Sequence, residues 1–121
     1  IKYSARDPSG QGWAGIYWQN PLNNWKESRG GQDLSKYKKL TFWARGEKGG
    51  EIISEVGVGG LAPNSGDVKM HHIVLTPDWK EYSVDLSKTN LTFVIHGFRI
   101  FVTRSGNPQG CVFYLDNILL E

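Results

Sequence analysis

Aromatic residues near charged or amide side chains are the residues of this sequence best suited to chemistry. Flat rings stack on the C–H faces of sugars, while guanidinium, carboxylate and amide groups bond to hydroxyls in pairs. The chain holds five each of Trp, Tyr and Phe in 121 residues. The candidates for contact with a sugar are the off-core aromatics and two arginines, Tyr17, Trp25, Trp43, Arg45, Arg99 and Phe101.

A second interpretation fits these residues equally well. Gln19, Glu55 and His71 supply polar neighbours to the aromatic set and favour binding. Large aromatic residues are, however, usually buried by something. A loop or a further strand that covered Trp43 and Phe101 would turn them into an extension of the core.

Other chemistry has little support in the sequence. Glycoside hydrolysis needs two carboxylates at set separations, and the acidic residues are scattered in turns or alternate between faces. His71 and His72 are adjacent, so a strand sends them to opposite faces. We expect His96 only to complete a turn and the lone Cys111 to pack rather than react. The sequence therefore predicts a protein that is not an enzyme.

Alternating apolar and polar residues recur every ten to fifteen positions, with Gly, Pro, Asn, Asp and Ser between them. This rhythm predicts an all-β antiparallel β-sandwich whose helices are at most single turns, for example at 33–37 and 85–88. The predicted strands are Ile1–Ala5, Gly12–Gln19, Lys38–Arg45, Glu51–Val58, Lys69–Thr76, Lys80–Leu86, Gly97–Thr103 and Cys111–Leu120.

Parity within these strands separates a core face from an outer face. Parity places Trp43 and Arg45 on the outer face of the strand Lys38–Arg45. It places Arg99 and Phe101 on the outer face of the strand Gly97–Thr103. We expect Trp79 to close one end of the sandwich. The predicted core positions are Leu40, Phe42, Ala44, Phe98, Ile100, Val102, Ala14, Ile16 and Trp18.

Five segments together resemble the galactose-binding-like domains of secreted prokaryotic proteins, which are related to jelly-roll carbohydrate-binding modules. The likeness covers nearly the whole chain, and it rests on the order and spacing of the segments. One departure is the run 26–29, which intervenes after Trp25 where a glycine is expected. The segments are Gly12–Pro21, Asn24-Trp25, Leu40–Gly46, Leu75–Tyr82 and Phe113–Ile118.

The resemblance implies a jelly roll of two antiparallel sheets, a location outside the cytoplasm or at the cell surface, and glycan binding without catalysis. It also implies a structural calcium ion, for which Asp116 matches one ligand position; in the rest of the sequence we nominate only Asp7, weakly, as a second ligand. Calcium binding takes six to eight oxygen ligands, so a structural role for Asp116 stays open. No cofactor is required for binding.

Chain length and net charge indicate the number of domains and limit the classes of partner. Residues 1–121 suit one domain. The chain begins directly in a strand pattern without a signal peptide, so we expect a module excised from a longer protein with other domains. A net charge of +2 with scattered basic residues argues against nucleic acid, and no apolar run approaches the roughly 20 residues that would insert in a membrane. The alternative function is a structural or protein-interaction β-sandwich without sugar binding.

Overall fold

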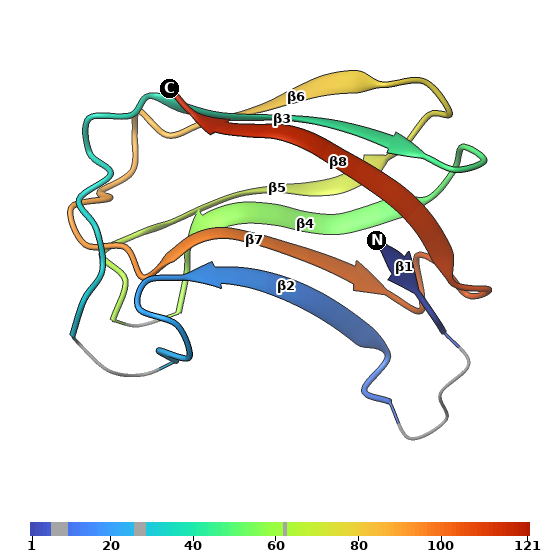
Figure 1. Ribbon diagram of the computed structural model, residues 1–121, viewed down its shortest axis with the longest axis horizontal. Helices are drawn as coiled ribbons and strands as arrows, with labels where there is room; N and C mark the ends of the chain where they lie inside the picture. Colours follow the sequence, from blue (N-terminus) through green and yellow to red (C-terminus); the bar gives the residue numbers. More distant parts are fainter. Residues whose placement is uncertain (6–9, 26–28, 62) are drawn as a thin grey trace.

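A computed structural model describes residues 1–5, 10–25, 29–61 and 63–121. These residues form two four-stranded antiparallel sheets that face each other, with strand orders β1-β8-β3-β6 and β2-β7-β4-β5 (Figure 1). The all-β sandwich is therefore confirmed. The strands are β1 (Lys2–Tyr3), β2 (Trp13–Gln19), β3 (Lys39–Gly46), β4 (Ile52–Gly59), β5 (Asp67–Val74), β6 (Lys80–Asp85), β7 (His96–Thr103) and β8 (Cys111–Leu120).

Each predicted strand is present, and most bounds move by one or two residues. The last strand begins and ends where the alternation predicts. The first strand is shorter than predicted: β1 comprises Lys2 and Tyr3, and Ile1 adds two backbone hydrogen bonds to Phe113 of β8. The segments 33–37 and 85–88 form turns: Asp33 accepts a hydrogen bond from the backbone N–H of Ser35 at 2.9 Å, and Asp85 accepts one from Ser87 at 2.9 Å.

The core lies between the sheets, where the alternate residues of β3, β4 and β7 meet. Phe42, Ile53 and Val56 are completely buried. Burial of an apolar side chain of this size contributes about 1.5–3 kcal/mol, so these residues supply much of the stability. Parity predicted the core correctly for β3 and β7.

The expectation that Ala14, Ile16 and Trp18 on the inner face of β2 are buried in the core is wrong, because all three are exposed. Ile16 and Trp18 point toward the interior, yet they are 40% and 53% exposed. Their cross-strand partners Ile100 and Phe98 are 2% exposed. The reason is that β2 is the edge of its sheet and the facing edge strand, β1, has two residues, so little covers β2 from the opposite side.

Candidate functional site

Four aromatic rings form a continuous row on the outer face of the β2-β7-β4-β5 sheet. We call Trp13, Phe101, Tyr17 and Trp25 the aromatic row. Consecutive ring centroids are 5.4, 5.2 and 5.0 Å apart, and the rings meet edge to face at 90°, 73° and 76°. This is the favoured geometry for aromatic pairs. Of the predicted set, Tyr17, Trp25 and Phe101 therefore lie together.

A glycine opposite Phe101 makes the row continuous. β2 and β7 pair Gly15 with Phe101, which leaves Trp13 and Tyr17 on either side of that ring. A Cβ atom on Gly15 would lie 2.4 Å from two carbons of the Phe101 ring. The ring therefore occupies the space over Gly15, and the absent side chain lets it lie close to the sheet.

The row is anchored at its centre and open at its ends. Tyr17 and Phe101 are half-buried, whereas Trp13 and Trp25 are 49% and 45% exposed. Burial raises the pKa of Tyr17, with Arg99 and Glu55 acting in opposite directions. The phenol is consequently neutral at physiological pH and can donate a hydrogen bond.

Arg99 lies beneath this surface rather than on it. The side chain is buried, and its guanidinium donates to Glu55 Oε1 at 2.8 Å, to the Gly59 carbonyl at 2.6 Å and to Asp67 Oδ1 at 2.5 Å. It also occupies the space over Gly57, where a Cβ would be 2.9 Å from Arg99 Cζ. The arginine thus joins β4, β5 and β7 and turns its donors away from a ligand.

Glu55 and Asp67 share the guanidinium of Arg99 but differ in their second partners. Burial alone would raise the pKa of Asp67, but hydrogen bonds from Arg99 and Lys69 outweigh it and lower the pKa. Glu55 keeps one oxygen, Oε2, which lies 3.8 Å from His71 Nδ1. Glu55 is therefore the carboxylate of this pair that reaches both the arginine and the surface beside the rings.

A shallow groove of about 460 Å³ runs beside the row. Rings line one side of the groove, and polar groups line the other, including Ser54 Oγ and Thr103 Oγ1, which are 3.1 Å apart. The arrangement offers apolar faces and hydrogen-bonding groups to the same ligand. The lining residues are Trp13, Tyr17, Ser54, Glu55, His71, Phe101 and Thr103.

His96 supports the row from below, so the expectation that it only completes a turn is wrong. It is fully buried, and its ring centroid lies 5.4 Å from that of Tyr17 and 5.8 Å from that of Trp25. Its Nδ1 lies 2.7 Å from Asn64 Nδ2, and its Nε2 lies 3.2 Å from the side-chain amide of Gln19. A histidine at a strand start gives no sequence signal for such a role.

The amide of Asn64 contacts both the ring of His96 and the backbone at the start of β7. Asn64 Oδ1 accepts the backbone N–H groups of Ile95 at 2.6 Å and His96 at 3.2 Å, which leaves Nδ2 as the donor to the ring. His96 Nδ1 then accepts this hydrogen bond. Burial, with a smaller contribution from Arg99, lowers the pKa of His96 and keeps it neutral.

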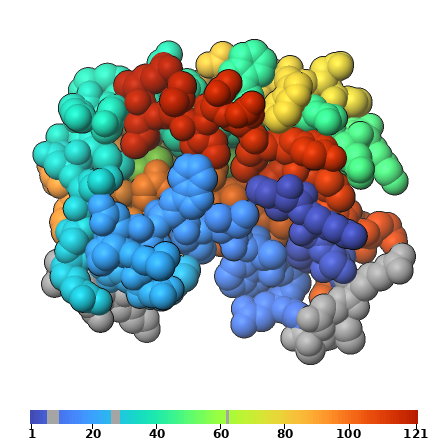
Figure 2. Space-filling model, in the orientation of Figure 1, coloured from blue at the N-terminus to red at the C-terminus, as the bar shows by residue number. Residues whose placement is uncertain are grey.

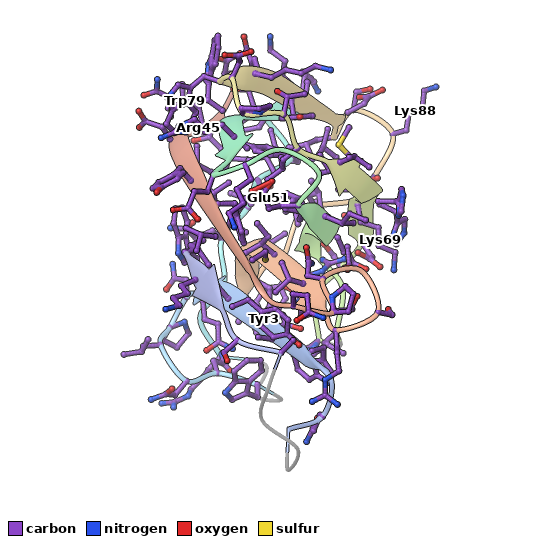
Figure 3. The ribbon with its side chains drawn as sticks, turned by 90° about the vertical axis from the view of Figure 1, so that its right-hand side faces the viewer. Tyr3, Arg45, Glu51, Lys69, Trp79 and Lys88 are labelled. Atoms are coloured by element: carbon purple, nitrogen blue, oxygen red, sulfur yellow. The ribbon has the colours of Figure 1, made fainter. Side chains whose placement is uncertain are left out.

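The structure places Trp43 and Arg45 on the other outer face, that of the β1-β8-β3-β6 sheet. The Arg45 guanidinium lies 4.4 Å from the ring centroid of Tyr114 and 5.6 Å from that of Trp79 (Figure 3). Trp79 is exposed here and does not close an end of the sandwich. The predicted site residues thus divide between two opposite surfaces.

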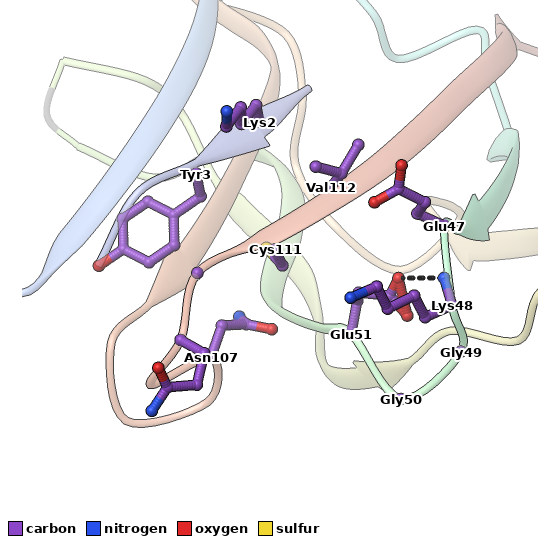
Figure 4. A pocket seen from close by; sticks show the side chains of 12 residues that line it. Lys2, Tyr3, Glu47, Lys48, Gly49, Gly50, Glu51, Asn107, Cys111 and Val112 are labelled. Carbon is purple, nitrogen blue, oxygen red and sulfur yellow. Dashed lines mark hydrogen bonds between the residues drawn. The ribbon is translucent and has the colours of Figure 1, made fainter. Parts of the chain in front are cut away.

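A second hollow of about 390 Å³ opens at the end of the sandwich beside the 47–50 loop (Figure 4). Glu51 Oε2 accepts the backbone N–H of Lys48 at 3.0 Å, and Oε1 is buried without a partner. Burial alone would raise the pKa of Glu51, but hydrogen bonds from the backbone of the loop lower it. This carboxylate holds the loop in place.

Asp116 is the residue that the resemblance assigns to a calcium ion. The side chain is exposed in β8, and its Oδ1 accepts the backbone N–H of Asn117 at 2.8 Å. Outside the gaps at 6–9, 26–28 and 62, no three His, Cys, Asp or Glu side chains are close enough to share a metal ion. Asp7 and most of the 26–29 run lie outside the described residues. Calcium binding stays a prediction.

Comparison with protein-family models, with curated proteins and with solved structures finds no match to this chain. The part of the chain that the structure describes contains no helix of the length and apolar character that a membrane span requires.

Proposed function

We propose that the chain is a non-catalytic carbohydrate-binding module that holds a glycan across the aromatic row. The observation that carries the proposal is the continuity of four rings, three of which (Trp13, Tyr17 and Phe101) line a groove that offers a carboxylate, hydroxyls and an imidazole. The resemblance in the sequence points the same way. In an extracellular or cell-surface protein, such a module would target attached domains to a polysaccharide.

The chemistry of the groove suits an uncharged glycan. Because Arg99 neutralises Glu55 at 2.8 Å, the free carboxylate oxygen acts as a hydrogen-bond acceptor for hydroxyls more than as a net charge. Trp13 and Trp25 are exposed enough to stack on sugar rings. A shallow groove buries little of its ligand, so we expect weak binding that improves with chain length.

Hydrolysis is poorly supported by the same geometry. Glycosidases use two carboxylic groups across the scissile bond. Among the described residues that line this groove, Glu55 is the one carboxylate, and it is held by Arg99. We therefore propose binding without turnover.

The proposal is tested by affinity electrophoresis against a panel of soluble polysaccharides, followed by calorimetry on those that retard the protein. We expect Trp25→Ala and Trp13→Ala each to weaken binding about tenfold, because each removes a stacking face. Trp43→Ala is the matched control, since that ring is also exposed but lies on the opposite face. Binding that survives both ring losses, or that disappears with Trp43, contradicts the assignment.

A second candidate, a structural or protein-interaction domain, is favoured by the exposed Trp43, Trp79, Tyr114 and Arg45 group. Exposed aromatic rings beside an arginine are common at protein interfaces. This candidate gains support if no polysaccharide in the panel retards the wild-type chain.

A further inference from the structure

The two ends of the aromatic row rest on different supports. Trp13 begins β2 and Trp25 follows the other end of that strand, and Figures 1 and 2 show this stretch, in blue, along the lower side of the molecule. Trp13 contacts the ring of Phe101. Trp25 contacts the rings of Tyr17 and His96, at centroid distances of 5.0 and 5.8 Å. Among the described ring contacts of the row, the Trp25 end alone therefore rests on a side chain that changes its charge near neutral pH.

His96 is fully buried, and its surroundings are arranged for an uncharged ring. Asn64 Oδ1 accepts the backbone N–H groups of Ile95 and His96, which directs Nδ2 of the same amide toward the ring, 2.7 Å from Nδ1. Nδ2 also donates to the Leu61 carbonyl. Turning the amide over would break these three hydrogen bonds. A proton on His96 Nδ1 would therefore place two donors face to face.

A positive charge on this ring would have no counter-ion among the residues that the structure describes. Burial, and then the guanidinium of Arg99 on the same strand, lower the pKa of His96. Glu55 of β4 is already bonded to that guanidinium at 2.8 Å. Tyr17 and Gln19 face the ring from β2 and are uncharged in neutral and acidic solution, and an indole and an amide face it from the segments after β2 and β4. The charged ring is therefore destabilised in this position and is favoured where it can reach water.

We propose that proton uptake by His96 displaces the Trp25 end of the aromatic row, so that the module binds its glycan at neutral pH and releases it in acid. The proton comes from solvent and adds to Nδ1, the ring separates from Asn64, and Trp25 loses the surface on which it lies. The contact between Trp13 and Phe101 is kept, because it is at the other end of the row. The release of a glycan rests on the proposed function, whereas the displacement of Trp25 does not.

Fluorine NMR of the protein labelled with fluorotryptophan tests the displacement without any glycan. The chain has five tryptophans, and Trp→Phe variants assign their resonances. On titration from neutral to mildly acidic pH, we expect the Trp25 resonance to shift with the same midpoint as the ring resonances of His96 in the same protein. The Trp13 resonance should keep its position through that titration, because the Trp13 ring lies against Phe101.

Calorimetry with a polysaccharide that retards the protein tests the release. We expect acid to weaken wild-type binding about tenfold, the loss expected for Trp25→Ala, because both changes remove the same stacking face. Trp25→Ala should therefore lose no further affinity in acid. His96→Gln keeps an uncharged side chain at this position and should bind equally at both pH values. His71→Gln is the control, since His71 lines the groove 3.8 Å from Glu55, and this variant should retain the acid response.

Three results would overturn the proposal. The first is a Trp25 resonance that does not follow the titration of His96 in the wild-type protein, a test that stands even if His96→Gln does not fold. The second is a simultaneous change at Trp13 and Trp25, which would mean that the whole domain unfolds. The third is an acid response of binding that persists in His96→Gln and disappears in His71→Gln. If no polysaccharide binds at neutral pH, the glycan function fails, and the Trp25 resonance still decides whether His96 controls the row.

Discussion

The two outer faces of the sandwich carry similar residues in opposite roles. Each has an arginine with aromatic rings nearby, but Arg99 is buried under its rings and bonded to Glu55 and Asp67, whereas Arg45 lies between rings at the surface. Side-chain burial explains the difference. Arg99 links strands within its sheet by bonding to carboxylates, and it therefore has a structural role. Arg45 only contacts aromatic rings at the surface.

The largest expected difference between the faces is in stability. Arg99→Met leaves Glu55 without its arginine and Asp67 with only the exposed Lys69, so we expect a loss of about 3 kcal/mol in the free energy of unfolding. Urea denaturation measures it. Lys69→Met is the control, because it removes only an exposed partner of Asp67 at 3.1 Å and should cost less than about 1 kcal/mol. Equal losses would show that Arg99 is not a structural link.

Glycine positions test whether the aromatic row depends on close packing. In Gly15→Ala the new methyl group meets the Phe101 ring, and we expect about 1–3 kcal/mol of destabilisation with weaker glycan binding. Gly97→Ala is the matched control, since no atom lies within 4 Å of the added carbon. We expect that variant to stay within about 0.5 kcal/mol of wild type. Wild-type stability and binding in Gly15→Ala would contradict the packing argument.

The sequence predicts much of this fold because its strands alternate cleanly. Parity places Phe42 and Ile100 inside, and Trp43 and Phe101 outside, as the structure has them. It cannot say that two outer faces belong to different sheets, because parity compares residues within a strand. The separation of Arg45 from Phe101 therefore needs the strand order.

Long-range contacts account for the other differences. Trp18 has a core pattern, but its exposure depends on how far β1 extends along the opposite sheet. Arg99 is a surface residue by type, and it is buried because Gly57 leaves space and two carboxylates from other strands meet it. His96 becomes a support only through Asn64, which is 32 residues away. None of these pairings has a local signal.

Acidification is expected to affect the face that rests on His96. Because burial and Arg99 lower its pKa in the folded protein, the unfolded chain binds the proton first as the pH falls. This contribution to stability is thus fully present above the ordinary histidine pKa of about 6.5 and declines below it. Protonation would also place an N–H of the ring against the Asn64 amide donor.

Urea midpoints measured between neutral and mildly acidic pH test this effect. His96→Gln removes the titrating group, so its stability should fall less between those pH values than that of wild type. His72→Gln is the control for the substitution itself, because that ring is exposed on β5. If His96→Gln retains the full slope, the acid sensitivity belongs to other groups.

The smallest expected effect is on the Arg45 face. Arg45→Met removes a cation that contacts Tyr114 and Trp79 at the surface, and exposed contacts of this kind contribute about 0.5–1 kcal/mol. Arg45→Lys should lose part of that energy, because an ammonium group cannot stack its plane on a ring. Glycan affinity should be unchanged in both, since the aromatic row is on the other face. If Arg45→Met lowered the free energy of unfolding as much as Arg99→Met, both arginines would be structural. Side-chain burial would then not explain the difference between the two faces.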